Sequence, residues 1–269
     1  MKIGFIGLGN MGSAMIGGII KNKLVEASDI IGSDYSRERV KEMEKSCGIS
    51  GASSNEEVAK NADILVTSVK PQVYETVIKG IRDKIKDNTV IVSIAPGKTI
   101  GWLTEKYNEN NTERKLKIVR CMPNTPALVG EGCTGVCRCE NVNDKEFETV
   151  LSILNSFGRA YEIPESQMDA VVAVSGSSPA YVFMLIEAMA DGAVAEGLSR
   201  KTAYEMAAQA VLGSAKMVLE SGKHPGELKD MVCSPAGTTI DAVALLEKRG
   251  FRSAVIDAER VCAAKSRSL

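Results

Sequence analysis

The sequence predicts an α/β domain over residues 1–164, followed by an all-helical domain over residues 165–269. Up to Pro164, short β-branched runs alternate with helical patterns, and this alternation is typical of a doubly wound parallel sheet. Beyond Pro164 the sequence pattern changes, because apolar residues recur at helical spacing and no segment has the pattern of a strand. A chain of 269 residues is long enough for two such domains.

The elements of the first domain follow from local patterns. Strands are predicted at Ile3–Ile6, Ile30–Ser33, Ile64–Val69, Val90–Ile94, Ile118–Cys121, Cys133–Cys137 and Ala160–Ile163. Helices are predicted between them at Ser13–Lys21, Ser36–Lys45 and Gln72–Lys84.

The second domain is expected to consist of helices only. Ser178 followed by Pro179 indicates a capped helix start, and this helix should end near Gly197. Further helices are expected over Lys201–Ser221, from Thr238 to Lys248 and from Arg252 to Lys265. Because these helices are apolar over much of their circumference, about a hundred residues would struggle to bury them alone. We therefore favour a helical dimer interface over a compact monomeric core.

Charge and histidine content exclude several functions. The formal net charge is −1, which argues against binding to nucleic acid or to an anionic membrane surface. The single histidine, His224, excludes mechanisms that need two histidines and histidine-rich metal sites. Cys133, Cys137 and Cys139 alternate with apolar residues like a strand, so free thiols are favoured over zinc and no metal is expected.

The expected location is the cytoplasm. The N-terminus lacks the basic and apolar regions of a signal peptide. The stretch Ala180–Ala195 carries Glu187 and Asp191, and by itself it is too short and too charged for a membrane span.

A glycine-rich loop follows the first predicted strand. Gly7, Gly9 and Gly12 match the pattern G-x-G-x-x-G, which has meaning here because it joins a strand to a helix. In such loops the glycines permit a tight turn, close approach of a pyrophosphate and close helix packing, while free N–H groups at the helix start hold the phosphates. The expected cofactor contacts in the loop are Gly7, Gly9, Asn10, Met11 and Gly12. The first domain is therefore predicted to be a Rossmann-like dinucleotide-binding domain.

The second strand ends at the residues that should face the adenosine ribose. Asp34 lies about 20 residues after the loop, where an acid ordinarily binds that ribose. Its carboxylate favours NADH because it would repel a 2′-phosphate, whereas Arg37 could pair with that phosphate. The expected cofactor is therefore NADPH or NADH.

Three later strands end in residues that should line the nicotinamide half of the cleft, because ligands of such sheets bind beyond the carboxyl ends of the strands. The expected cofactor contacts here are Val69, Lys70, Pro71, Ala95, Gly97 and Asn124. An ordinary turn would explain each Pro or Gly singly, but not all three strand ends together.

Two small-residue segments of the helical half are candidates for binding a substrate carboxylate. Ser234–Ile240 feeds a predicted helix, and N–H groups at a helix start form an anion site. Ser175–Pro179 is expected to form a second such start, with Ser177 as its substrate contact.

Several motifs, in order over essentially the whole chain, resemble those of pyrroline-5-carboxylate reductases. They are Gly7–Gly12, Val69–Gln72, Met122–Val129, Ser175–Phe183 and Ser234–Thr239. The resemblance implies an oxidoreductase that reduces 1-pyrroline-5-carboxylate to L-proline with NAD(P)H, the last step of proline biosynthesis. It also implies a helical dimerisation domain, a homodimer and often a ring of dimers. We expect the active site to need the helical domain of a partner chain.

The resemblance also implies roles for single residues. Thr239 would be the catalytic residue, with its hydroxyl at the ring nitrogen of the substrate, and the N–H groups of Gly237, Thr238 and Thr239 would hold the carboxylate. Asn55 matches a position that contacts the adenosine ribose. Two residues depart from the family pattern: Met231 replaces a polar residue of some members, and Ala236 replaces a glycine. The methyl group of Ala236 would be tolerated only at negative φ.

Two other functions stay open. One is a reductase of the β-hydroxyacid dehydrogenase type or a deazaflavin-linked NADP reductase; the first would need a catalytic lysine in a glycine-rich helix, and the second leaves Ser234–Thr239 unexplained. The other is a non-catalytic NAD(P)-sensing protein, which would bind the cofactor without turnover.

Overall fold

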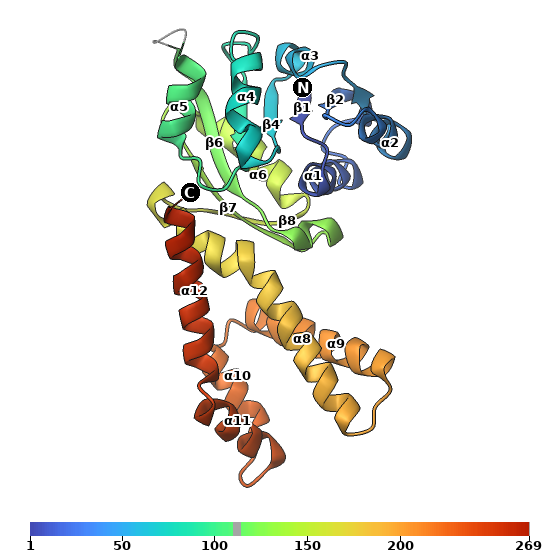
Figure 1. The fold of residues 1–269 in the computed structure, drawn as a ribbon, viewed down its shortest axis with the longest axis vertical. Helices are drawn as coiled ribbons and strands as arrows, with labels where there is room; N and C mark the ends of the chain where they lie inside the picture. Colours follow the sequence, from blue (N-terminus) through green and yellow to red (C-terminus); the bar gives the residue numbers. More distant parts are fainter. Residues whose placement is uncertain (110–113, 269) are drawn as a thin grey trace. The chain divides into compact units, whose positions relative to one another are not determined.

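The computed structural model describes residues 1–109 and 114–268, and the backbone divides into two compact units (Figure 1). The sheet unit comprises Met1–Ser177 together with the end of the chain from Cys262. The helical unit is Ser178–Val261. Each unit is described by itself below.

The sheet unit is built on one eight-stranded sheet of order β3-β2-β1-β4-β5-β6-β7-β8. The strands are β1 (Ile3–Ile6), β2 (Ile30–Ser33), β3 (Ser50–Gly51), β4 (Ile64–Thr67), β5 (Val90–Ser93), β6 (Lys117–Met122), β7 (Gly132–Arg138) and β8 (Gly158–Glu162). From β3 to β6 the strands are parallel. The order reverses direction between β1 and β4, and ligands of doubly wound sheets bind at this switch point.

Helices cover both faces of the sheet (Figure 1). The faces alternate along each strand, so that Ile64 and Val66 lie in one hydrophobic cluster and Leu65 in the other. The first cluster includes residues of α1 (Asn10–Lys21), α2 (Arg37–Cys47) and α6 (Asp144–Asn155). The second includes residues of α3 (Asn55–Asn61), α4 (Pro71–Ile81) and α5 (Ile100–Asn108).

The sheet differs in one respect from the wholly parallel sheet predicted. All seven predicted strands are present, but β7 runs antiparallel to β6. The link from Met122 to Gly132 holds only the short 3₁₀ helix η2 (Thr125–Val129), and a parallel crossover needs a dozen or more residues. A short link therefore forces the chain to turn back. β8 is again parallel to β7, because α6 forms a full crossover.

A long helix leads from the sheet unit into the helical unit. After a single 3₁₀ helix, η3 (Glu165–Gln167), it runs through α7 (Met168–Val171), the π-helical stretch η4 (Val172–Ser177) and α8 (Ser178–Ala195) without a break. The predicted helix start at Ser178 and Pro179 is therefore wrong. A π turn, rather than a helix cap, accommodates the proline, which removes a backbone donor from the helix.

The helical unit contains the remaining helices. They are α9 (Arg200–Ser221), α10 (Pro225–Val232), α11 (Thr238–Lys248) and α12 (Phe251–Arg267), the last of which ends in the sheet unit. Among the described residues, no strand follows β8. Of the apolar side chains described in the helical unit, only Ala190, Ala203 and Ala207 are buried.

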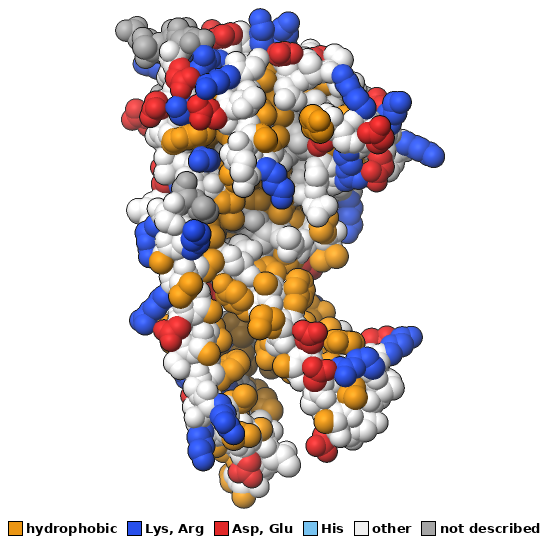
Figure 2. All heavy atoms as spheres, viewed as in Figure 1, with side chains coloured by type: hydrophobic (Ala, Val, Ile, Leu, Met, Phe, Trp, Pro, Cys, Tyr) orange, Lys and Arg blue, Asp and Glu red, His pale blue; other side chains and the backbone are white. Residues whose placement is uncertain are grey.

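Large apolar side chains of the helical unit are exposed instead (Figure 2). Phe183 is 61% exposed, Met206 59% and Val261 70%. Exposed apolar surface of this extent marks an interaction surface in a soluble protein. The helix Glu165–Ala195 is long and apolar enough to cross a membrane, by length and composition only, and it is the one such helix among the described residues. It is this long because the helix extends back beyond Ser178. Core helices of soluble proteins can have the same length and composition.

Candidate active site

The glycine-rich loop joins β1 to α1 at the switch point. Gly7 has a left-handed backbone (φ 96°), and a Cβ there would lie 2.7 Å from the Ser68 carbonyl oxygen. A Cβ on Gly12 would lie 2.4 Å from the Gly7 carbonyl oxygen. Both positions therefore require glycine for the turn and for close packing. A Cβ on Gly9 would meet no atom within 4 Å, so the backbone there is open to a ligand.

The N-terminus of α1 is suited to a phosphate group. Gly9 is its N-cap and supplies no side-chain hydrogen bond, and the first turn contains no acidic residue. The N–H groups of Asn10, Met11 and Gly12 belong to the first helical turn, which has no intrahelical acceptors. Such groups and the helix dipole together favour an anion.

Asp34, predicted to bind the adenosine ribose, organises the loop. One carboxylate oxygen accepts the N–H of Leu8 at 2.7 Å, and the other accepts the N–H of Ser36 at 2.9 Å. The carboxylate thus connects the β2–α2 turn to the glycine-rich loop. Each oxygen keeps a second lone pair with which it can accept a ribose hydroxyl.

Arginine and asparagine side chains surround this turn. The Arg37 guanidinium donates to the carbonyl groups of Ala52, at 3.0 Å, and Ser53. The Asn55 side-chain oxygen accepts the Ser33 hydroxyl at 2.7 Å, which turns its NH₂ group away from Ser33. Sequence analysis missed Ser33, because a serine at a strand end has no distinctive pattern.

Arg39 was also missed as part of the loop. Its Nε donates to the Leu8 carbonyl at 2.8 Å, and a terminal nitrogen donates to the Ser13 hydroxyl at 2.6 Å. It therefore braces the loop from α2. In the sequence, Arg39 stands in the first turn of the helix that follows Asp34, and this position could have indicated its contact with the loop. An arginine at a solvent-exposed helix start has the same sequence pattern, so the two cases could not be told apart.

The ends of β4 and β5 lie at the same edge of the sheet. Lys70 is the exposed N-cap of α4, Pro71 is its first residue, and Val69 is half-buried. After β5, Ala95 is buried and Gly97 is left-handed with φ 73°. The structure thus brings these predicted contacts to one edge, as the parallel register of β4 and β5 requires.

Buried hydroxyl groups lie directly behind these strand ends. The Tyr74 hydroxyl donates to Ser93 Oγ at 2.8 Å and contacts the Thr67 hydroxyl, while Ser93 Oγ accepts the N–H of Ala95 at 3.4 Å. Burial raises the pKa of Tyr74 to about 12, so the phenol is neutral and can donate. This network connects α4 to the loop after β5.

The side chain of Asn124, predicted as a cofactor contact, is hydrogen-bonded to other parts of the protein. Its side chain is 8% exposed. Its amide nitrogen donates to the Ser175 carbonyl at 2.9 Å, and its oxygen accepts the N–H of Cys133 at 2.8 Å. Both ends of the amide thus bind the protein itself.

Ser177 is the last residue of η4. Its hydroxyl oxygen accepts the thiol of Cys262 at 3.1 Å. The predicted anion site at a helix start over Ser175–Pro179 is wrong, because no helix begins there. The N–H groups of this segment lie within a continuous helix, where they face carbonyl groups of the preceding turn. Any role of Ser177 must therefore depend on its hydroxyl group.

The second substrate segment lies in the helical unit. Gly237 is the N-cap of α11, which has no side-chain cap, and Thr238 and Thr239 are its first residues. A Cβ on Gly237 would lie 2.3 Å from Ser234 Oγ. The methyl group of Ala236 would be free of strain only at negative φ. The φ of Ala236 is 54°, so its backbone is strained. Met231 is 62% exposed.

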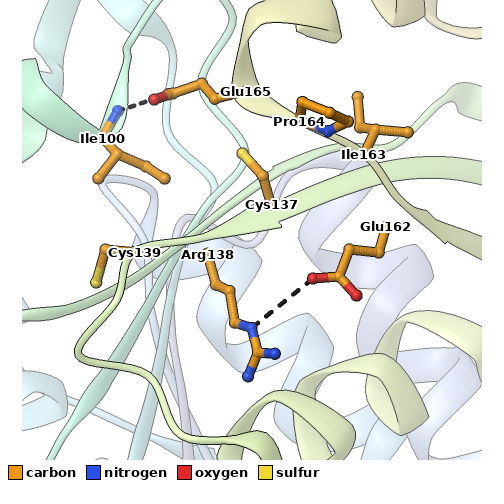
Figure 3. Close-up of a pocket in the computed structure, with 8 residues that line it drawn as sticks. All are labelled: Ile100, Cys137, Arg138, Cys139, Glu162, Ile163, Pro164 and Glu165. Atoms are coloured by element: carbon orange, nitrogen blue, oxygen red, sulfur yellow. Dashed lines mark hydrogen bonds and ion pairs between the residues drawn. The ribbon is translucent and has the colours of Figure 1, made fainter.

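A separate cavity of about 550 Å³ lies on the sheet unit (Figure 3). Its lining includes Cys137, Arg138, Glu162 and Glu165 but none of the predicted site residues. Arg138 is 3.7 Å from Glu162, and Glu165 accepts the N–H of Ile100 at 2.7 Å. Burial raises the pKa of the Cys137 thiol to about 12. The charges of Arg138 and Glu165 are thus paired, and the Cys137 thiol stays protonated.

Comparisons with known proteins distinguish the alternatives. The family model "Pyrroline-5-carboxylate reductase dimerisation" matches residues 165–269, and "NADP oxidoreductase coenzyme F420-dependent" matches residues 2–97. The pyrroline-5-carboxylate reductase of Escherichia coli is 49% identical over 268 residues, which cover 100% of this chain and 98% of that protein. The chain belongs to the pyrroline-5-carboxylate reductase family.

Other relatives agree with this assignment to the pyrroline-5-carboxylate reductases. The reductase of Methanosarcina acetivorans is 42% identical, over 100% of this chain and 97% of that protein. A crystal structure of the Plasmodium falciparum pyrroline carboxylate reductase with NADP bound is 36% identical, with a TM-score of 0.89 over 100% of this chain and 97% of that one. A Mycobacterium tuberculosis 3-hydroxyisobutyrate dehydrogenase, 16% identical with a TM-score of 0.51 over 74% of this chain and 66% of that one, shares the fold alone. The predicted Rossmann-like domain followed by a helical dimerisation domain is confirmed.

Proposed function

We propose that the chain reduces 1-pyrroline-5-carboxylate to L-proline with NADPH or NADH, the last step of proline biosynthesis. The observation that carries this function is the 49% identity to the Escherichia coli reductase over the full chain. The open Ser234–Thr239 loop, with an uncapped helix start, supports a site that still binds an anionic substrate.

The residues of the sheet unit fit a dinucleotide. The N–H groups from Gly9 to Gly12, including those of Asn10 and Met11, would hold the pyrophosphate, because Gly9 leaves them accessible. Those of Gly7 and Leu8 already donate to the Ser33 carbonyl and to Asp34. Asp34, Arg37 and Asn55 would hold the adenosine ribose. Val69, Lys70, Pro71, Ala95 and Gly97 would line the nicotinamide end. When bound, the reduced nicotinamide supplies the hydride.

We favour NADPH over NADH. The matching N-terminal family model describes an NADP oxidoreductase, and the Plasmodium falciparum relative has NADP bound. Both oxygens of Asp34 already accept backbone N–H groups, and Arg37 lies three residues away in the sequence. A 2′-phosphate would gain a charge-assisted hydrogen bond from Arg37 if its guanidinium left the Ser53 carbonyl.

The residues at the start of α11 would hold the substrate. It is a cyclic imine that bears a carboxylate, and the N–H groups of Thr238 and Thr239 would bind that carboxylate at the positive end of the helix dipole. The N–H of Gly237, predicted to bind it too, instead donates to the Ser234 carbonyl at 3.1 Å. The Thr239 hydroxyl would donate a hydrogen bond or a proton to the ring nitrogen. Ser177 would contribute a further hydroxyl. Orientation of the imine carbon is the main contribution that these groups make to the rate.

The chain acts as a homodimer in the cytoplasm, and the dimers associate further into a ring. Support comes from the dimerisation model over residues 165–269 and from the apolar surface of the helical unit. The family is soluble, so the apolar surface of the helix Glu165–Ala195, which is largely exposed in the single chain, would be covered in the dimer. Light scattering of the purified protein measures the assembly, and an active, stable monomer would contradict it.

The deciding experiment follows the absorbance of NADPH and of NADH during incubation with 1-pyrroline-5-carboxylate. Oxidation that depends on the imine, with proline as the product, is expected. Binding of NADPH without any oxidation would indicate a nucleotide-sensing protein and would overturn the proposed function. Incubation without the imine serves as the control.

A further inference from the structure

The π-helical stretch Val172–Ser177, here called the π-bulge, packs closely on the sheet. A Cβ on Gly176 would lie 3.2 Å from Met122 of β6, and a Cβ on Gly135 of β7 would lie 2.7 Å from Val171. Glycines at both positions therefore let the bulge approach β6, and the helical turn just before it approach β7. π-Bulges are rare and occur frequently at functional sites. Ser177, the candidate substrate contact, is the last residue of this one.

The carbonyl group of Ser175 has an unusual donor. In an α-helix it would accept the N–H of residue 179, but Pro179 has no N–H, and in the π-helical register the residue opposite it is Ala180. Asn124, 51 residues earlier in the chain, donates its amide nitrogen to this carbonyl at 2.9 Å. The orientation of the amide follows from chemistry, because its other end accepts the N–H of Cys133 and only the oxygen can accept.

We propose that Asn124 is a positioning residue that holds the π-bulge against β6 and β7 and so orients Ser177, rather than a residue that contacts the cofactor. The side chain is nine-tenths buried, and both of its ends are bonded to the backbone. Ser177 is held from its other side by Cys262, whose thiol donates to the serine oxygen. The serine therefore keeps its own hydrogen for donation to an anionic substrate. The kinetic part of this proposal rests on the proposed reductase function.

The test is a double-mutant cycle of Asn124→Asp and Pro179→Ala. The aspartate keeps an acceptor for Cys133 but replaces the donor to Ser175 with a second acceptor. Pro179→Ala restores a backbone N–H that can donate to the Ser175 carbonyl. For N124D we expect kcat/KM for 1-pyrroline-5-carboxylate to fall about tenfold, a loss of ~1.4 kcal/mol, while the NADPH dissociation constant from calorimetry stays within about twofold. P179A in the N124D background should recover part of this loss.

Three results would overturn the proposal. A rise in the NADPH dissociation constant in parallel with the loss of activity would make Asn124 a cofactor ligand. If N124D leaves the kinetics unchanged, or if P179A does not reduce its loss of kcat/KM, then the bond from Asn124 to the Ser175 carbonyl does not position Ser177. If N124D does not fold, Asn124→Ser replaces it, because the smaller side chain leaves room for a bridging water.

Thermal unfolding of the same variants keeps the proposal testable if the enzyme proves to have another substrate. N124D should lower the melting temperature more in the wild-type background than in the P179A background. Equal losses in both backgrounds would refute the contact between Asn124 and the proline-bearing helix, whereas absence of turnover in the wild type would refute the reductase function alone.

Discussion

Ala236 stands in a backbone conformation that favours glycine, and replacing it should stabilise the protein. Its φ of 54° places the Cβ against the following carbonyl group, which costs about 1–2 kcal/mol for an L-residue. Ala236→Gly removes this strain, but glycine loses about 0.4–1 kcal/mol more chain entropy on folding. The net expectation is a gain of about 0.5–1 kcal/mol in the free energy of unfolding.

Thermal unfolding at fixed protomer concentration measures this gain, since the melting temperature of an oligomer depends on concentration. A rise of about 1–4 °C is expected for a chain of this size. Ala208→Gly is the matched control, because Ala208 is exposed in the middle of α9. There the same substitution should destabilise by about 0.5–1 kcal/mol.

The two variants are expected to change the melting temperature in opposite directions, and this difference is the test of the strain at Ala236. If A236G lowers the melting temperature as A208G does, Ala236 does not occupy the left-handed region in solution, and the strain argued from its φ is absent. A larger loss at Ala208 would leave the sign unchanged, because burial of α9 against a partner chain only adds a cavity to the cost.

Six further variants test the site and the surface charges. Thr239→Ala should lower kcat about 100-fold with an unchanged unfolding transition, and Thr239→Ser should retain most of the activity; full turnover of T239A would exclude the proton-donor role. Gly9→Ala should raise the KM for NADPH without changing stability, because its Cβ meets no protein atom, whereas Gly12→Ala should lower the melting temperature, because its Cβ would lie 2.4 Å from the Gly7 oxygen; equal stability losses would contradict this geometry. Arg37→Met should raise the KM for NADPH about tenfold and leave that for NADH unchanged, and an equal effect on both would show that Arg37 does not bind the 2′-phosphate. Hydrogen bonds from Lys106 and Arg82 lower the pKa of Glu109 from 4.5 to about 2. A lowered pKa stabilises the fold above pH 4.5 and loses this effect as the pH falls towards 2, so urea unfolding should find Glu109→Gln less stable than wild type at pH 6, with a gap that closes at low pH.

The strands of the sheet were predictable because each is a short apolar run between turn residues. The bounds of β1 and β2 and those of α11 agree with the prediction to the residue. The helices α3, α5 and α6 and the two-residue strand β3 were not predicted. Their own patterns are short or weak, and contacts with the sheet stabilise them.

Those parts of the candidate site were predictable that depend on the backbone conformation of single residues. The turn at Gly7 and the close packing at Gly12 depend on local φ and on the absence of a side chain, so the glycine pattern was sufficient. The bonds of Asp34 to Leu8 and Ser36 were not foreseen, since they depend on how two loops meet.

The sequence by itself determined every strand except β3, the cofactor loop and the family, because these depend on local conformation and on motifs in a fixed order. Tertiary structure alone decided the antiparallel turn of β7, the continuity of the helix through Pro179 and the partners of Asn124. A proline after a serine is compatible both with a helix start and with a π-bulge. In the structure a distant amide donates to the Ser175 carbonyl of the bulge, and a bond across 51 residues leaves no trace in the local pattern.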